Sequence, residues 1–333
     1  MTAEGSRRGR ARPNRASKTR SSGKKRTIER FGRHAVEITN PDRVLFPRIG
    51  LTKLGLVDYY RAVAGSMLPH LRGRPLTQQR FPTSVEEEGF YQKQIPDSFG
   101  DWVGRCRLEL REPKDGETHQ TQVVCDNLAT LVLLAQHGCV TPHVWTSRCD
   151  RLDRPDQLVF DLDPSRDDFD DVRFAAQVLR ELLDELELVS FLKTTGSRGL
   201  HVHVPLRREH SFDRARSFCH QLAALLASRH PDRLTVEQRK AKRGDRLYLD
   251  VARNAWGQTV VPPFSARARP DAPVAMPIPW QALDDASIGP GSYRVDNAPE
   301  AIAQGPDPWS GFARRARGLS APERRLKRLA RSS

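Results

Sequence analysis

The sequence has no apolar run long enough to cross a lipid bilayer, and its basic N-terminus lacks the apolar stretch of a secretory signal peptide. It has only five cysteines, which are scattered along the chain and include no Cys-x-x-Cys pair. Neither a zinc ribbon nor a disulfide framework is therefore indicated. No internal repeat is visible. We expect a globular protein that contacts no membrane and works in a reducing cytoplasm.

Acidic residues are scarce at both ends of the chain. Residues 1–33 hold twelve Lys or Arg and two acids, and residues 311–333 hold eight Lys or Arg and one acid. Of the net charge of +14, the two tails therefore supply +17, which leaves −3 for the rest of the chain. The basicity belongs to the tails rather than to the folded body.

The two tails are expected to differ in structure. Residues 1–33 have almost no apolar side chains to offset their ordering entropy, so we expect a disordered basic arm. Such an arm either binds nucleic acid through counterion release or serves only as a solubilising tail. Residues 296–333 are expected to be a second basic tail. Leu326 and Leu329 share one helical face there, so this tail either docks a partner or frays.

Hydrophobic periodicity between the tails indicates two modules with a boundary near residue 150. The first, residues 34–150, is an N-terminal α/β module. It contains a helix over 52–71 with Thr52 as N-cap and a second helix over 126–137 capped by Asp126.

The second module, residues 151–295, contains the order strand, helix, strand, strand, helix, strand. This order is typical of a split, ferredoxin-like or RNA-recognition-like sheet. The predicted fold class is therefore mixed α/β (α+β), with the N-terminal module packed on this sheet.

Two aspartates end the apolar strand "LVFDLDPS" at 158–165. Because strand side chains alternate between faces, Asp161 and Asp163 share one face. A third acid, Asp250, lies in the strand-like "LYLDVARN". An Asp-x-Asp pair alone is a weak signal, since many are caps or salt-bridge partners. Three acids on one sheet face repel each other unless a cation neutralises them, and oxygen ligands suit Mg²⁺ or Mn²⁺ acting on a phosphate.

A glycine-containing loop follows in "KTTGSRGLHVHVP" (193–205). Gly196 and Gly199 let the backbone approach a ligand, and free N–H groups, hydroxyls and an arginine would bind an anion. His201 and His203 alternate onto one face. We expect only His201 to touch a ligand and His203 to be structural, with a metal-binding histidine pair as the alternative.

Together these stretches resemble one family. "LVFDLDP", "TTGSRGLHVHVPL" and "LYLDVARN" are similar to the three motifs of the primase-polymerase domain of bacterial DNA ligase D. That domain belongs to the archaeo-eukaryotic primase superfamily and acts in non-homologous end joining. The likeness extends upstream through "TNPDRVLFP" and "GFYQKQ" and downstream through "PPFSARAR", so it covers about residues 36–290.

The resemblance implies a primase-polymerase fold and nucleotidyl transfer on two divalent ions, with Mn²⁺ usually favoured and ribonucleotides preferred over deoxyribonucleotides. It implies that catalysis and metal binding fall to Asp161, Asp163 and Asp250. It implies that the incoming NTP or dNTP is held by Thr195, Ser197, Arg198, Gly199, His201, His143, Arg243 and Arg267, with His143 near the sugar. It implies that DNA is bound by Asn40, Arg43 and Lys53 at a 5′-phosphate and by Phe90 and Tyr91, which stack on template bases.

The sequence departs from the family at a few of these positions. Thr195 stands where Ser is usual, and Arg43 and Arg198 stand where Lys is common, so charge is kept but hydrogen-bond geometry changes. Tyr91 replaces a frequent Phe. The long basic arm lies outside the pattern. No ligase or nuclease domain accompanies the polymerase, so we expect ligation from another chain.

The resulting expectation is a stand-alone end-joining polymerase of the bacterial nucleoid. It would bind 5′-phosphorylated ends, gaps or 3′ overhangs and add nucleotides to a primer 3′-OH, with Ku and a separate DNA ligase as partners. Three alternatives stay open. They are a DNA primase that starts chains de novo, a non-catalytic DNA-end bridging protein that acts through its tails, and a metal-dependent nuclease.

Overall fold

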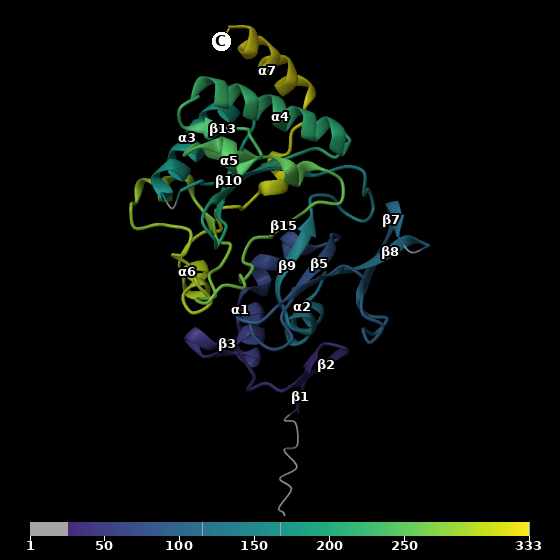
Figure 1. Ribbon diagram of the computed structural model, residues 1–333. Coiled ribbons are helices and arrows are strands. Elements are labelled where there is room, and N and C mark those ends of the chain that lie inside the picture. The colour runs from purple at the N-terminus through teal and green to yellow at the C-terminus, as the bar shows by residue number, and fades with distance from the viewer. Residues whose placement is uncertain (1–25, 115, 167, 333) are drawn as a thin grey trace, which may run out of the picture.

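The computed structural model describes residues 26–114, 116–166 and 168–332. Two β-sheets occupy the centre of the molecule in Figure 1. Helices α3 (Phe169–Glu185) and α4 (Phe212–Arg229) lie above the upper sheet, and helices α1 (Lys53–Leu71) and α2 (Leu128–Gln136) lie below the lower one. Within the described residues, no helix is both long and apolar enough to span a membrane.

The lower sheet has the strand order β15-β9-β5-β8-β7, with β6 paired to β5. Its strands are β5 (Pro75–Arg80), β6 (Phe90–Gln92), β7 (Gly104–Lys114), β8 (Glu117–Val124), β9 (Cys139–Trp145) and β15 (Thr259–Val260). Strand β15 comes from the second half of the sequence, so the chain returns to complete this sheet. In the register of β5 with β9, Leu76 opposes Val144 and Thr77 opposes His143. Since faces alternate, His143 lies on the opposite face from Val144.

The upper sheet has the strand order β13-β14-β10-β12-β11-β16. Its strands are β10 (Gln157–Asp163), β11 (Phe191–Thr194), β12 (Leu200–Pro205), β13 (Leu234–Thr235), β14 (Leu247–Asp250) and β16 (Pro277–Ile278). The predicted order of strands and helices is confirmed by β10, α3, β11, β12, α4 and β14. Strand β13 and the short helix α5 (Lys240–Arg243) are additional elements between α4 and β14.

The helix caps follow from local hydrogen bonds. The Thr52 side chain accepts from the Gly55 N–H at 3.1 Å, which confirms the predicted cap of α1. For α2 the prediction was wrong by one residue. Asn127 caps it by accepting from the Thr130 N–H at 2.9 Å, while the Asp126 carboxylate accepts from the Gly73 N–H at 2.7 Å.

Part of the predicted N-terminal arm is folded. Its residues 1–25 lie outside the described part, but strands β1 (Arg26–Phe31) and β2 (His34–Thr39) form an antiparallel hairpin. Residues 26–33 were therefore assigned to disorder wrongly. The reason is backbone pairing supported by ion pairs, since Glu29 contacts Arg61 and Arg26 contacts Glu37. A further small hairpin joins β3 (Val44–Phe46) and β4 (Leu51–Thr52).

The C-terminal segment is packed against the body rather than being a free tail. It contains helices α6 (Ala298–Gln304) and α7 (Ser320–Ser332), and Arg317 forms a parallel bridge with Leu206 after β12. Trp309, Leu319 and Leu326 are all at most 3% exposed. The high density of arginine hides these few apolar anchors in the sequence, which is why a tail was expected.

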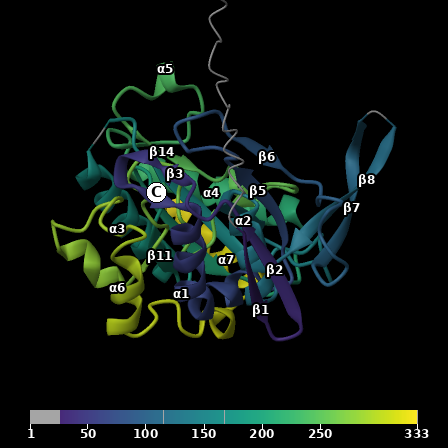
Figure 2. The ribbon, with the colours of Figure 1, turned by 90° about the horizontal axis from the view of Figure 1, so that it is seen from below.

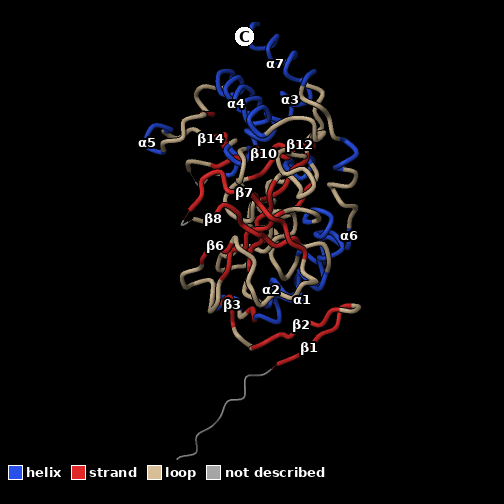
Figure 3. Tube along the Cα trace, turned by 90° about the vertical axis from the view of Figure 1, so that its right-hand side faces the viewer, coloured by secondary structure: helices blue, strands red, loops and turns tan. Residues whose placement is uncertain are grey.

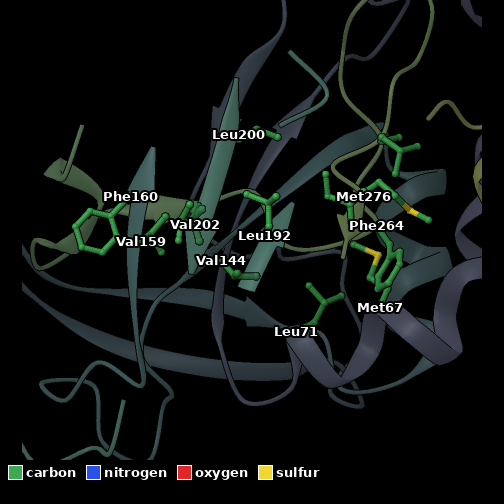
Figure 4. Close-up of a cluster of buried hydrophobic side chains, with 14 of the residues drawn as sticks. Met67, Leu71, Val144, Val159, Phe160, Leu192, Leu200, Val202, Phe264 and Met276 are labelled. Atoms are coloured by element: carbon green, nitrogen blue, oxygen red, sulfur yellow. The ribbon is translucent and has the colours of Figure 1, made fainter. Parts of the chain in front are cut away.

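One apolar core joins both sheets and their helices. Phe160 and Val202 belong to the upper sheet, and Figure 4 shows Met67 and Leu71 of α1 close to Phe264 and Met276. Each fully buried side chain of this size contributes about 1.5–3 kcal/mol to folding. The core fixes the two sheets against each other. Figure 2 shows that α5 and the β7–β8 hairpin project from this body, and Figure 3 shows the projection of α5 from another side.

Candidate functional site

Four charged or polar side chains form a row across the upper sheet. Antiparallel register places Asp161 opposite Asp250 on one side and opposite His201 on the other, and His201 opposite Lys193. Residues opposite each other in a sheet lie on the same face with Cβ atoms about 4.5–5.5 Å apart. The row therefore reads Asp250, Asp161, His201, Lys193 from β14 to β11.

The carboxylates of this row fit a divalent cation. Asp161 and Asp250 are like charges placed directly opposite, which is unfavourable unless a cation lies between them. Asp163 shares their face, and oxygen donors of this kind suit Mg²⁺ or Mn²⁺. Within the described residues no three acidic, His or Cys side chains already form a metal-binding group. Asp163 instead pairs with Arg198 at 2.9 Å, and Asp250 Oδ1 accepts from the Ala252 N–H at 2.8 Å.

Burial and neighbouring charges set the protonation of the row. Burial lowers the pKa of His201 to about 4 and that of Lys193 to about 7. Burial alone would raise the pKa of Asp161, but His201, Arg253 and Lys193 outweigh it and the pKa is lowered. At neutral pH, Asp161 is therefore ionised and His201 is neutral. The His201 Nε2 atom lies 3.4 Å from Asp161 Oδ1, so the ring acts as its hydrogen-bond donor.

The loop between β11 and β12 is packed against the end of β10. A Cβ on Gly199 would lie 2.0 Å from the Leu162 carbonyl oxygen, so only glycine fits there. Gly196 adopts a left-handed φ of +61°. The Thr195 hydroxyl accepts from the Ser197 and Gly199 N–H groups at 3.1 and 3.3 Å. The sequence predicted free N–H groups in this loop, and for these two the prediction was wrong, because both donate to Thr195, which holds the loop in shape.

Arginines surround this loop. Arg267 donates to the Thr195 carbonyl at 2.7 Å, and Arg269 donates to Ser197 Oγ at 2.5 Å. Arg243 is 6% exposed, lies 3.6 Å from Asp163 Oδ2 and stacks on the Tyr248 ring at 4.0 Å. With Arg198, these side chains place four positive charges around the loop and the carboxylates, an arrangement suited to a polyphosphate.

Two adjoining cavities open onto the row. The smaller, of about 120 Å³, is lined by Asp161, Asp163 and the loop, and the larger, of about 370 Å³, extends toward Tyr91 and His143 of the lower sheet. Asp161, His201 and Arg267 line both. Burial lowers the pKa of His143 to about 3, and its ring meets Tyr91 edge-on at 5.4 Å.

Buried polar atoms without a partner mark the walls of these cavities. Within the described residues, no hydrogen bond is made by His143 Nε2, His201 Nδ1, Arg267 Nε or Thr77 Oγ1. Leaving a buried polar atom unpaired costs about 1–3 kcal/mol, so a polar ligand would relieve the cost.

A separate cavity of about 170 Å³ lies within the N-terminal module. Arg43, Lys53 and Arg80 line it. Lys53 is 3% exposed and donates to the Gln136 side chain at 3.0 Å. Burial and then the charge of Arg43 lower the pKa of Lys53 to about 8, so the amine is mainly protonated at neutral pH. Asn40 is not among the lining residues. It occupies the adjacent turn with φ +50°, where its carbonyl accepts from the Arg43 N–H at 3.1 Å.

The two aromatic residues that were expected to stack on bases are exposed. Phe90 is 45% and Tyr91 59% exposed, and both lie on β6. The Arg80 guanidinium lies 5.2 Å from the centre of the Phe90 ring. Large apolar side chains on a short edge strand make a surface available to a planar ligand.

Sequence reasoning missed several residues that the fold brings to the site. Lys193 lies in the row, Arg253 and Lys93 line the larger cavity, and Arg80 lines the cavity of Lys53. For Lys193 the sequence held a usable signal, which is a lysine inside the apolar strand "FLKTT". The others depend on contacts between distant segments, which periodicity does not reveal.

The likeness to known proteins agrees with this geometry. A model of the family described as LigD, primase-polymerase domain, matches residues 52–309. The multifunctional non-homologous end joining protein LigD of Mycolicibacterium smegmatis is 33% identical over 264 residues, which are 78% of this chain and 34% of that protein. The corresponding protein of Pseudomonas aeruginosa is 31% identical over 298 residues, 87% of this chain and 34% of that protein. The chain thus spans about a third of the length of these curated relatives.

Solved structures give the same result. The polymerase domain from Mycobacterium tuberculosis ligase D, solved in complex with DNA, matches with a TM-score of 0.79 and 30% sequence identity. The match covers 85% of this chain and 99% of that domain. The fold class expected from the sequence is confirmed, and the matching domain is a polymerase of the nucleotidyltransferase class. The chain belongs to the family of primase-polymerase domains of DNA ligase D.

Proposed function

We propose that this chain is a DNA-end-joining polymerase, which adds nucleotides to a primer 3′-OH at 5′-phosphorylated breaks and gaps. One observation carries the proposal. Asp161 and Asp250 oppose each other on a sheet face that meets an arginine-rich glycine loop and a cavity with unpartnered polar atoms. The relatives named above are end-joining proteins, and the matching domain was solved with DNA.

Asp161, Asp163 and Asp250 are the residues that would hold two Mn²⁺ or Mg²⁺ ions. When bound, the ions stabilise the charge that develops on a transferring phosphoryl group. Asp163 reaches this role by exchanging partners, because its carboxylate is paired with Arg198. A triphosphate competes for Arg198 and releases the Asp163 carboxylate, so the protein couples the arrival of substrate to completion of the carboxylate set.

The remaining site residues bind and orient the nucleotide. Arg198, Arg267 and Arg269 neutralise the triphosphate, while Thr195 and Gly199 keep the loop close to the end of β10. The primer 3′-OH then attacks the α-phosphorus, and the bond to pyrophosphate breaks. This requires in-line positioning, which the fixed loop supplies.

The larger cavity is proposed to hold the base and sugar. Its His143 and His201 rings are neutral at pH 7, and each has one nitrogen without a partner. Those atoms suit the hydroxyl groups of a ribose, so we propose that ribonucleotides are preferred.

The cavity of Arg43, Lys53 and Arg80 is proposed to take the 5′-phosphate of the DNA end, with Asn40 at its rim. A buried, protonated lysine beside two arginines is costly alone and is stabilised by a phosphate. Phe90 and Tyr91 would stack on template bases. We further propose that Ku delivers the ends, that a DNA ligase seals them, and that the work takes place at the bacterial nucleoid in the cytoplasm.

A single-gap assay tests the proposal. A duplex with a 5′-phosphorylated one-nucleotide gap and a labelled primer is incubated with Mn²⁺ or Mg²⁺ and with ribo- or deoxyribonucleotides. We expect extension by the unmodified protein, no extension by Asp161→Ala, and normal extension by Asp213→Asn, a surface carboxylate on α4. DNA binding by Asp161→Ala should survive in a gel shift.

Other outcomes would identify other functions. Extension by Asp161→Ala at the unmodified rate would refute the assignment of the carboxylates. Metal-dependent shortening of the DNA without nucleotides would indicate a nuclease, synthesis on an unprimed single strand would indicate a primase, and DNA binding without any extension would indicate a bridging protein.

A further inference from the structure

A fourth cavity, of about 970 Å³, lies beside the proposed nucleotide cavity. Val260 of β15 lines both, and the two histidines of β12 divide between them, since His201 lines the nucleotide cavity and His203 lines this one. It is enclosed by α1, the end of β12 and the C-terminal segment around Trp309. Its size is at the upper end of the range for ligand pockets, about 300–1,000 Å³.

Part of the lining of this cavity is aromatic. The Trp309 and Phe312 rings stack in parallel with centroids 5.2 Å apart and planes inclined by 10°. His70 meets Trp309 edge-on at 5.5 Å, and all three residues line the cavity. Burial lowers the pKa of His70 to about 3, so its ring is neutral at pH 7. This part of the lining suits a planar, apolar ring.

The lining is also strongly basic. The lining includes six arginines and three carboxylates, a surplus of three positive charges. Arg74 is 3% exposed and donates to Asp156 at 2.7 Å, and Arg148 reaches the same carboxylate at 2.9 Å. Asp156 therefore faces two guanidinium groups, of which Arg74 is buried and Arg148 is half-buried. Arg151 and Arg207 stand at the exposed rim. The surplus of positive charge along the lining suits an anion.

A hydrogen-bond acceptor also lines the cavity, on the His203 ring that lies 4.8 Å from the Trp309 ring. His203 is 1% exposed, and its Nδ1–H donates to the Gln157 side-chain oxygen at 2.9 Å. Burial holds the pKa of His203 well below its usual value, so the ring is neutral and its Nε2 carries a lone pair. That Nε2 has no partner within the described residues. A ligand with a hydroxyl or amino group beside the His203 ring would donate a hydrogen bond to this nitrogen.

From this arrangement we propose that the cavity is a second binding site for a nucleotide unit. A base fits the aromatic rings, a sugar hydroxyl or exocyclic amine fits His203, and a phosphate fits the arginines. The unit is either a free mononucleotide or part of a single strand that continues from the neighbouring cavity past Val260. The proposal rests on lining residues that the polymerase mechanism does not use.

Photocrosslinking tests the site directly. The full chain is irradiated with 5-iodouridine monophosphate in one arm and with a single-stranded tetranucleotide containing 5-iodouracil in the other, and the crosslinked peptides are identified by mass spectrometry. Neither probe carries a triphosphate. We expect crosslinks at Trp309 or His70. The probe that gives them shows whether the site binds a free nucleotide or a nucleotide within a single strand.

Two kinds of variant control the result. A Cβ on Gly65 of α1 would meet no atom within 4 Å, and Gly65 lines the cavity, so Gly65→Trp plugs it while Gly65→Ala leaves it open. The plug should abolish the crosslink and Gly65→Ala should keep it. The double change Arg151→Glu with Arg207→Glu should weaken binding at least about tenfold, since contacts to charged groups are lost. Arg216→Glu, an exposed arginine on α4, should have no effect.

The result that overturns the proposal is equally specific. Crosslinks confined to Tyr91 and His143 with either probe would place all nucleotide binding in the neighbouring cavity. Undiminished crosslinking by the rim double variant, whose exposed positions do not affect folding, would also overturn it. Gap extension is measured in parallel, so failure of this site is distinguished from failure of the polymerase function.

Discussion

Lys193→Met is the most informative single change to the row of charged residues. Lys193 is fully buried, and its Nζ has no hydrogen-bond partner within the described residues. Burial, and then the charge of Arg267, lower its pKa from 10.5 to about 7. Methionine has a similar length without the charge, so it should fill the same space without overpacking the core.

The size of the effect follows from the two pKa values. A gap between about 7 in the folded state and 10.5 in the unfolded state corresponds to about 4–5 kcal/mol. Below pH 7 the lysine is protonated in both states, and folding bears the full cost of burying the charge. Between pH 7 and 10.5 the unfolded state binds more protons, so the lysine protein gains up to about 1.4 kcal/mol of stability per pH unit. Above pH 10.5 the cost is absent.

The assay is urea unfolding in the presence of EDTA from pH 6 to pH 10. We expect Lys193→Met to be more stable than the unmodified protein by several kcal/mol at pH 6, and the difference to shrink steadily toward pH 10. Lys93→Met, at an exposed lysine, should show no such pH-dependent difference. A difference that stays constant with pH, or an unmodified protein that is the more stable at pH 6, would refute the reasoning about this row.

Three further predictions concern the loop and the DNA contacts. Gly199→Ala should reduce nucleotide addition at least about tenfold, because its Cβ would lie 2.0 Å from the Leu162 oxygen. Gly289→Ala should leave the rate unchanged, because a Cβ there has no atom within 4 Å. Equal rates for the two variants in the gap assay would contradict this prediction. Lys53→Gln should reduce the preference for 5′-phosphorylated over 5′-hydroxyl DNA about tenfold in paired gel shifts, and an unchanged preference would argue against the phosphate cavity. Tyr91→Ala should weaken binding of a template overhang by about 1–3 kcal/mol and Tyr91→Phe should not, as fluorescence anisotropy would show; similar losses from both would rule out stacking.

The catalytic half of the fold could be predicted because its signals are local. Strand alternation alone puts Asp161 and Asp163 on one face. The order of strands and helices in residues 151–295 follows from periodicity, and the glycine loop from its composition. The direct opposition of Asp161 to Asp250 depends on the pairing of β10 with β14, which no local signal in the sequence indicates.

The rest depends on contacts between distant segments. The C-terminal segment reads as a tail because arginines outnumber the buried Trp309, Leu319 and Leu326, and only the docked structure shows that those few residues are enough. The large basic cavity is likewise invisible in the sequence, since α1, β12 and the C-terminal segment each supply only part of it. Composition reveals charge, but not which charges are brought together.

The partner exchange at Asp163 links the two halves of the proposed site. Arg198 forms an ion pair with the Asp163 carboxylate. The affinity of the site for a cation should therefore rise when a triphosphate binds Arg198 and frees this carboxylate. A nonhydrolysable triphosphate should therefore tighten Mn²⁺ binding in the unmodified protein, and Arg198→Ala should show little of this coupling.

The central claim is that Asp161 and Asp250, far apart in sequence, hold a cation between two strands. Mn²⁺ titration followed by electron paramagnetic resonance measures this without any catalysis. We predict that Asp161→Asn and Asp250→Asn each weaken Mn²⁺ binding at least about tenfold, whereas Asp213→Asn binds as the unmodified protein does. Unchanged Mn²⁺ affinity in Asp250→Asn would contradict the account.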